Sequence, residues 1–387
     1  MGLSVTGTFL PSAVLSDSSI EAFAAKVREM RRPRIVVLSG AGISTAAGIP
    51  DFRTPGTGLY ANLAKYRLPA PEAIFDLNYF RMRPDAFWTL ARELDPSRYV
   101  PTYTHFFIRA LHEQGWLLRN YTQNIDMLER KAGIPEDLLV EAHGTFATAR
   151  CLGPRTAAAA SAPPSMITTS AATNTTTCSL TLDFTDYMAR LQRDEVPVRC
   201  PSCGGLVKPS ITFFGESLPP RFDLAWDDLP QADLLIVLGT SLMVQPFASL
   251  ISQVGAHVPR LLINREAAWA RMAPLPTTST RRDALYLGTT DDGCRRLAEL
   301  LGIAPLVQAL QDAYHAAHAA ASSPASPASA AAVAALGVPA ASAFGVEGTQ
   351  QVALDQHFGQ RQFLDVEAVG VEKPLAENEF QNDVFEL

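Results

Sequence analysis

Six short apolar runs, each about the length of a β-strand, constrain the fold of this 387-residue chain more than any other feature. Their apolar residues are nearly continuous instead of alternating, which is typical of parallel strands buried on both faces. Segments with helical periodicity lie between them. This alternation predicts a doubly wound, Rossmann-type α/β sheet, in which ligands bind at the carboxyl ends of the strands. The expected strands are residues 34–38, 117–122, 138–142, 233–238, 260–264 and 284–287, and the expected helices are 20–31, 85–94, 104–113, 247–254 and 293–301.

Three segments interrupt this pattern. Residues 54–84 are rich in Pro and aromatic residues and predict a helical insertion, while residues 145–215 hold four of the five cysteines and predict a smaller module. Residues 321–387 turn to Ala, Ser and Pro and then become acidic, which predicts a disordered tail because too little apolar surface offsets the chain entropy. The expected divisions are an N-terminal extension (1–19), a Rossmann-type domain (20–144 and 216–303), the cysteine module (145–215, with a low-complexity insertion at 154–177), a C-terminal helix (304–320) and the tail (321–387).

The formal charge of −7 is confined to one end of the chain. Residues 324–387 hold 2 basic and 9 acidic residues, so the remaining 30 Lys and Arg balance 30 Asp and Glu. The absence of a net positive charge in residues 1–323 argues against a specific nucleic-acid binder, because the affinity of such a protein depends on neutralising phosphates. It leaves contact with a basic, lysine-bearing partner open.

Five cysteines are an odd number, and residues 1–19 lack the basic and apolar regions of a secretory signal. Both features favour a reducing compartment, where cysteines act as metal ligands or free thiols. The uncharged stretch 319–346 is too rich in Ala, Ser and Pro to predict a membrane span. We expect an intracellular protein, cytoplasmic or nuclear, with the mitochondrion left open.

A glycine-rich turn, Gly40-Ala41-Gly42-Ile43-Ser44, follows the first expected strand. Glycines at such a turn let the backbone approach a pyrophosphate, although a tight turn would use them for steric reasons alone. The third glycine of the usual dinucleotide fingerprint is missing, and no acidic residue closes the second strand. The turn therefore does not predict an ordinary dehydrogenase.

Polar residues follow several of the expected strands. Asp51-Phe52-Arg53 comes shortly after the glycine turn, Gln123-Asn124-Ile125-Asp126 ends the second strand, and His143 ends the third. Singly, they could be a capping Asp, a hydrogen-bonded Asn and a satisfied His. Together they predict one shared site at the carboxyl ends of parallel strands, with His143 placed to act as a general base.

At this point the chain resembles the sirtuin family of NAD-dependent protein deacylases. The resemblance extends over about residues 20–303, is closest to the eukaryotic class I branch, and rests on GAGISTAAGIPDFR, TQNID, EAHGTF, CPSCGGLVKP, FFGESLP and GTSL. It implies that NAD is a consumed co-substrate. The oxygen of an acyl-lysine displaces nicotinamide, His143 acts as general base, and the products are free lysine, nicotinamide and 2′-O-acyl-ADP-ribose.

The resemblance also implies roles for individual residues. The implied catalytic residues are His143, Asn124 and Asp126. The implied NAD-binding residues are Gly40, Ala41, Gly42, Ser44, Asp51, Phe52, Arg53, Gln123, Asn124, Ile125, Asp126, Gly239, Thr240, Ser241, Asn264, Arg265, Glu266 and Cys294, the last through its backbone. The implied peptide-binding residues are Thr212, Phe213, Phe214, Gly215, Glu216, Val244, Gln245, Pro246 and Phe247, between which an extended acylated peptide would add as a strand.

Two departures from the family pattern affect substrate binding. Thr212 stands where close relatives usually have Val, and Met127 stands where a smaller or polar residue is usual. No evident arginine–tyrosine pair in residues 61–75 is dedicated to an acidic acyl group, although Tyr66 and Arg67 keep that possibility open. Acetyl and longer apolar acyl groups on lysine are therefore expected, in histone or non-histone proteins.

Two cysteine pairs predict a structural zinc site. Cys200 and Cys203 have the spacing that lets two thiolates hold one zinc ion. Cys151 and Cys178 are separated by 26 residues, but no histidine between Gly144 and Ala256 could replace Cys178. The longer loop costs about 2 kcal/mol in closure entropy, against roughly 10–16 kcal/mol from a Cys₄ zinc site. Alternatives are four plain thiols, or a misread gene segment.

Two other functions remain open from the sequence. A mono-ADP-ribosyltransferase would use the same cleavage of NAD but leave ADP-ribose on protein. An NAD-sensing scaffold would bind without turnover, although Asn124, Asp126 and His143 are all present.

Overall fold

The predicted parallel sheet is present in the computed structural model, which describes residues 14–50, 63, 68–153, 178–268 and 281–322. Its six strands follow the order β3-β2-β1-β7-β8-β9, and all neighbours are parallel. The strands are β1 (Ile35–Ser39), β2 (Leu117–Thr122), β3 (Leu139–Glu141), β7 (Leu234–Leu238), β8 (Arg260–Asn264) and β9 (Asp283–Leu287). Strand order reverses between β1 and β7, the position where such sheets bind ligands.

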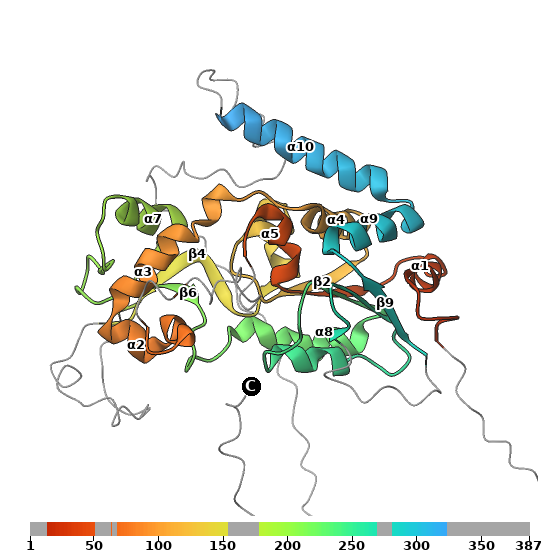
Figure 1. The fold of residues 1–387 in the computed structure, drawn as a ribbon, viewed down its shortest axis with the longest axis horizontal. Coiled ribbons are helices and arrows are strands. Elements are labelled where there is room, and N and C mark those ends of the chain that lie inside the picture. The colour runs from red at the N-terminus through yellow and green to blue at the C-terminus, as the bar shows by residue number, and fades with distance from the viewer. Residues whose placement is uncertain (1–13, 51–62, 64–67, 154–177, 269–280, 323–387) are drawn as a thin grey trace, which may run out of the picture. The chain divides into compact units, whose positions relative to one another are not determined.

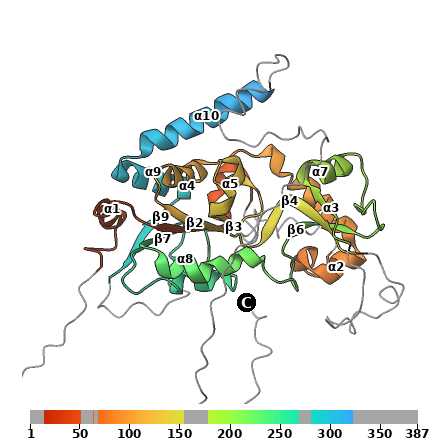
Figure 2. The same ribbon diagram turned by 180° about the vertical axis from the view of Figure 1, so that it is seen from behind.

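Helices cover both faces of this sheet, as the apolar strands require. On β1, Ile35 and Val37 belong to one hydrophobic core, whereas Val36 and Leu38 belong to the other. Figures 1 and 2 show α4 and α9 between the sheet and α10, and α8 on the opposite side. The first core contains α1 (Ile20–Arg28), α4 (Tyr103–Glu113), α9 (Thr290–Leu301) and the start of α10 (Ala304–Ser322), and the second contains η8 (Pro220–Leu224), α8 (Ala225–Gln231) and the 3₁₀ helix η9 (Phe247–Ser252).

A second, smaller sheet packs with the helices of the insertion around an aromatic core. Its strands follow the order β5-β4-β6, and both pairings are antiparallel. Phe213 lies 5.0 Å from Phe87, ring centre to ring centre, in an edge-to-face contact typical of buried aromatic pairs. The elements are β4 (Gly144–Cys151), β5 (Thr181–Asp183), β6 (Val207–Ile211), η4 (Pro71–Phe75), α2 (Leu77–Met82), α3 (Pro84–Glu93) and α7 (Phe184–Gln192).

Short helices complete the connections, and one expected helix differs in type. The short helices are η1 (Ala41–Ile43), η2 (Thr45–Ala47), η5 (Pro96–Arg98), α5 (Leu128–Lys131) and η6 (Glu136–Leu138). The helix expected over 247–254 is present, but it is of the 3₁₀ type and ends at Ser252 (η9). The hydroxyl of Ser249 donates to the carbonyl of Pro246 at 2.7 Å, the kind of local hydrogen bond that competes with an α-helical start.

Several expectations fall on residues outside the described part of the chain. They are residues 54–62 and 64–67 of the insertion segment, the low-complexity insertion 154–177 and nearly all of the acidic tail 321–387. None of the helices among the described residues is long and apolar enough to cross a membrane.

Candidate functional site

The glycine turn after β1 lies directly against the turn after β7. The N–H of Gly42 donates to the carbonyl of Gly239 at 2.8 Å, and a Cβ atom on Gly42 would lie only 2.6 Å from the Cα of Gly239. Gly239 itself has a positive φ of 59°, which favours glycine. Both positions therefore require glycine, and the backbone of this turn lies at the switch point of the sheet. That is the arrangement a pyrophosphate needs.

Three polar side chains from the segments that follow β1 and β2 form a connected group beside this turn. The hydroxyl of Ser44 donates to Oδ2 of Asp126 at 2.7 Å, and Nδ2 of Asn124 donates to Ser44 Oγ and to the carbonyl of Gly40, both at 3.2 Å. Burial raises the pKa of Asp126, although the hydrogen bonds from Ser44 and the N–H of Leu128 act in the opposite direction. The group is thus fixed in orientation by its own hydrogen bonds.

The ring of His143 is oriented by the strand end next to it. Its Nδ1 lies 3.0 Å from the carbonyl oxygen of Gln123. A carbonyl only accepts, so Nδ1 carries the proton and Nε2 keeps its lone pair. Burial lowers the pKa of His143, against a smaller opposing effect of the Gln123 carbonyl, so the imidazole is neutral at neutral pH.

These groups meet at one cleft of about 710 Å³, a size typical of small-molecule sites. Ser44 and Asp126 line a smaller recess of about 40 Å³ that shares Ala41, Asn124 and Ile125 with the cleft. The predicted residues that line the cleft are Ala41, Gly42, Gln123, Asn124, Ile125, His143, Thr212, Phe213, Phe214, Gly215, Glu216, Gly239, Thr240, Ser241, Val244, Gln245, Pro246, Asn264, Arg265 and Glu266.

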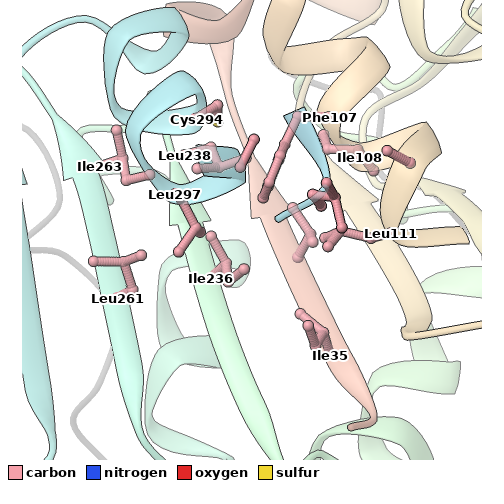
Figure 3. Packing of buried hydrophobic residues seen from close by; sticks show 14 of the residues in the cluster. Ile35, Phe107, Ile108, Leu111, Ile236, Leu238, Leu261, Ile263, Cys294 and Leu297 are labelled. Atoms are coloured by element: carbon pink, nitrogen blue, oxygen red, sulfur yellow. The ribbon is translucent and has the colours of Figure 1, made fainter. Parts of the chain in front are cut away.

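Other predicted site residues lie away from the cleft lining. The Cys294 side chain is fully buried in the core against the sheet, where burial raises the pKa of its thiol (Figure 3). Phe247 is also fully buried, with its ring centre 6.3 Å from that of His143. Gly40 supports the site through its carbonyl. Asp51, Phe52, Arg53, Tyr66 and Arg67 lie outside the described residues.

The sequence interpretation missed three cleft residues at the start of α9, namely Gly288, Thr289 and Thr290. The hydroxyl of Thr289 caps the helix by accepting the N–H of Asp292 at 3.1 Å, and that of Thr290 donates to the carbonyl of Gly42 at 3.2 Å. The signal was present, because a threonine three residues before an aspartate is typical of a helix start after a strand.

The four cysteines of the smaller module come together, including Cys178 from beyond the long insertion. Cys151 Sγ lies 3.4 Å from Cys203 Sγ, and Cys178 Sγ lies 3.6 Å from Cys200 Sγ, with all four sulfurs within 4.8 Å of one another. Tetrahedral zinc with bonds of about 2.3 Å holds sulfurs about 3.8 Å apart. The four-cysteine cluster therefore fits a structural zinc site.

The thiol of Cys200 ionises at lower pH than an ordinary cysteine thiol. Burial raises the pKa of Cys200, but hydrogen bonds from the backbone N–H groups of Cys203 and Ser202 lower it to about 7. Thiolates are the form that binds zinc. Four sulfur donors complete a tetrahedral shell, so such an ion has no open position for catalysis.

Comparison with known proteins agrees with this architecture. Residues 40–246, more than half of the chain, match the Sir2 family. The chain belongs to the Sir2 family. The match begins at the glycine turn and ends at Pro246, so it includes the cleft residues from β1 to β7 and the four cysteines.

Relatives of this Sir2-family chain match about three quarters of its length. It is 45% identical to the NAD-dependent protein deacetylase sirtuin-2 of Danio rerio over 301 residues, which cover 75% of this chain and 73% of the relative. Sirtuin-3 of Mus musculus is 48% identical over 284 residues (73% and 76%), and hst2-1 of Emericella nidulans is 52% identical over 295 residues (76% and 72%). Both are also named NAD-dependent protein deacetylases.

A buried ion pair supports one wall of the cleft in this Sir2-family chain. Lys208 on β6 is fully buried, and its Nζ lies 2.9 Å from Oε2 of Glu216. The same oxygen accepts the N–H of Phe213 at 2.9 Å, and Oε1 of Glu216 accepts from Arg150 at 2.6 Å. Burial lowers the pKa of Lys208 to about 8, while Glu216 opposes this effect. These contacts fix the loop 212–216 between the smaller sheet and the cleft.

Proposed function

We propose that this chain is an NAD-dependent protein-lysine deacetylase. The observation that carries the proposal is that the glycine turn, the Asn124–Ser44–Asp126 group and Nε2 of His143 meet at one cleft. The names of the relatives support the same activity. The substrate that donates the acetyl group is an acetylated protein, histone or non-histone.

The residues of the cleft have separate tasks in this reaction. The backbone of residues 40–42 receives the pyrophosphate of NAD, and Asn264 with Glu266 receives the adenosine ribose hydroxyls. Asp126 accepts a hydrogen bond from the carboxamide of nicotinamide and holds the ring as it leaves. NAD supplies C1′ of its nicotinamide ribose as the electrophile, and the acyl oxygen of the lysine forms a bond to it as the bond to nicotinamide breaks.

His143 then moves a proton. Its Nε2 takes the proton of a ribose hydroxyl, whose oxygen attacks the acyl carbon. The lysine amine leaves with a proton, and one water molecule then adds to the acyl carbon. The bond between this carbon and the oxygen on C1′ breaks, which leaves a hydroxyl on C1′ and the acyl group on the other ribose oxygen of ADP-ribose. The imidazole ring of His143 is held for this step by the Gln123 carbonyl, which accepts a hydrogen bond from its Nδ1. The buried wall of Phe213 limits the access of water, and the bound geometry brings the reacting atoms together.

The shape of the acyl-lysine site favours uncharged acyl groups. Phe75, Ile211 and Phe213 line the cleft near His143 with apolar surface, and Glu216 is already paired with Lys208 and Arg150. We expect the acyl amide to lie between the loop 212–216 and the residues 244–247, with the peptide backbone hydrogen-bonded to both.

The experiment that tests this function identifies the products. The full-length protein is incubated with NAD and acetyl-lysine, longer acyl-lysine and succinyl-lysine peptides, and the products are resolved by mass. Free lysine peptide with acyl-ADP-ribose in equal amounts would support the proposal. ADP-ribose attached to protein would indicate a transferase instead, and binding of NAD without any product would indicate a scaffold.

A further inference from the structure

Three ionisable groups, two of them buried and one half-buried, gather at the recess of the site. They are Asp126, Glu129 on α5 and His105 on α4. One ring nitrogen of His105 and one carboxyl oxygen from each acid lie within 4.8 Å of one another. Glu129 is 2% exposed and His105 is fully buried. Asp126 takes part in the proposed cleavage of NAD, whereas Glu129 has no direct role in it.

Two atoms of this cluster have spare hydrogen-bonding capacity. Nδ1 of His105 accepts the N–H of Thr102 at 3.1 Å, which leaves the ring proton on Nε2. Nε2 of His105 and Oε1 of Glu129 are both buried, and neither has a hydrogen-bond partner among the described residues. Buried polar atoms of this kind are uncommon in proteins. Both belong to residues of the cluster that contains Asp126.

Glu129 is also tied to the strand end that carries Asn124. Its carboxyl group is hydrogen-bonded to the side chain of Thr122, and the Oγ1 of Thr122 accepts the N–H of Asn124 at 3.1 Å. Asn124 in turn donates to Ser44, which donates to Asp126. Glu129 therefore lies close to Asp126 at one end of the Asn124–Ser44–Asp126 group and is linked to Asn124 at the other end through Thr122.

The charge of the cluster follows from its burial. Burial and the neighbouring Asp126 raise the pKa of Glu129 to about 8, and Glu141 adds to this shift. Lys131 has the opposite effect on Asp126, and burial lowers the pKa of His105 to about 3, so the ring is neutral. Two buried carboxyl groups so close together share one proton at neutral pH. The cluster then carries a single negative charge.

We propose that Glu129 is a positioning residue for NAD cleavage, acting as a neutral carboxyl group that keeps Asp126 the only anion of the cluster and supports Asn124 through Thr122. The inference rests on the proposed function, because the positioned groups are those that hold NAD. When Glu129 loses its proton, a second buried charge repels Asp126, and the nicotinamide site is disturbed.

The activity test compares Glu129→Gln with Glu129→Leu at saturating NAD and peptide. We expect the wild-type kcat to fall above about pH 8. Glu129→Gln keeps a neutral hydrogen-bonding group, so it should retain most activity at neutral pH and lack the alkaline fall. Glu129→Leu should lower kcat about 10- to 100-fold, as loss of a supporting hydrogen bond does at other sites. An unchanged pH profile in Glu129→Gln, or an unchanged kcat in Glu129→Leu, would overturn the proposal.

Asp228→Asn is the matched control. Asp228 is a buried acid that pairs with Arg119 at 2.6 Å and accepts from Tyr121 at 2.6 Å, away from the cleft. Its loss should lower Tm but leave the alkaline fall of kcat in place. Disappearance of the fall in this variant as well would make the effect of Glu129 a consequence of lost stability and overturn the proposal.

A second measurement needs no catalysis. Infrared spectra of the protein without substrates should contain the carbonyl band of a protonated carboxyl group at neutral pH, lost at alkaline pH and absent from Glu129→Gln. If the wild type lacks this band, the inference fails whether or not the protein cleaves NAD. If the band is present but NAD is not cleaved, the proposed function fails instead. A second equivalent of bound zinc that disappears in Glu129→Gln would also overturn the inference, since the cluster would then be a metal site.

Discussion

Nδ1 of His143 donates a hydrogen bond of 3.0 Å to the backbone carbonyl of Gln123. The two residues come from the ends of neighbouring strands, β3 and β2, so the sheet itself sets the orientation of the ring. Because the proton is fixed on Nδ1, the lone pair of Nε2 is available to a substrate. The position of His143 at a strand end thus determines which of its ring nitrogens carries the proton.

Replacing His143 by alanine should abolish deacetylation and leave the fold intact. General-base catalysis contributes roughly 10²- to 10⁴-fold, so we expect a loss of kcat in that range. The measurement is turnover of an acetyl-lysine peptide. Tm and zinc content serve as controls and should not change, because the four cysteines belong to the smaller module and not to the parallel sheet. Normal turnover by His143→Ala would show that another group acts as the base.

The acid side of the pH profile should reflect the same histidine. His143 must be neutral to accept a proton, and burial lowers its pKa below the usual value of about 6.5. Activity should therefore persist as the pH falls to that value and decline only below it. The measurement is kcat/KM for the peptide as a function of pH. A midpoint above about 6.5 would contradict the shift.

Ser44→Ala should weaken NAD cleavage by leaving Asp126 short of a partner. The lost hydrogen bond is to a charged group, which is worth about 1.5–3 kcal/mol and corresponds to roughly a 10- to 150-fold fall in kcat/KM for NAD. Thr89→Ala is the matched control, because its hydroxyl donates only to the carbonyl of Asp85 on α3. Equal losses in the two variants would argue that the hydroxyl of Ser44 has no special role.

Much of the fold followed from the apolar runs because buried parallel strands have a simple signature. The runs at 117–122 and 260–264 coincide with β2 and β8. Elements of the smaller module were harder to predict. Helix α7 and strand β5 are short, and they are held by an aromatic core that is assembled from segments distant in sequence. Local periodicity does not report such contacts.

The site was predicted where residues follow strands directly, and missed where tertiary contacts create it. His143 and Asn124 follow strands, and their convergence follows from the topology. The buried pairing of Lys208 with Glu216 has no sequence signal, because a lysine in a strand is usually exposed. The thiol of Cys294 is buried in the core, and the contact with NAD that the resemblance implied for this residue was through its backbone alone.

Lys208→Met should disturb peptide binding more than chemistry. Breaking a buried ion pair costs about 3 kcal/mol of the free energy of unfolding, and Glu216 would then hold the loop 212–216 only through Arg150. We expect the KM for the peptide to rise about tenfold, or about 1.4 kcal/mol, with kcat changed much less. Lys26→Met, which removes an exposed lysine paired with Glu29, is the control and should change neither. A fall in kcat with unchanged KM would contradict the role of this pair.

Changing Cys178 and deleting the insertion that precedes it should have opposite effects on the zinc content of the four-cysteine cluster. Cys178→Ser removes one of four sulfur donors and should lose most of the bound zinc, and with it much of the roughly 10–16 kcal/mol that such a site contributes.

Deleting residues 154–177 keeps every thiol and leaves only Leu152 and Gly153 between Cys151 and Cys178. The shorter loop lowers the closure cost by about 2 kcal/mol, so zinc should stay near one per chain and resist chelators at least as well. Metal content and Tm before and after chelation measure both effects, and Cys294→Ala, a thiol buried in the other core, should keep its zinc. If the shortened protein loses zinc, the insertion itself is needed to bring Cys178 to the cluster.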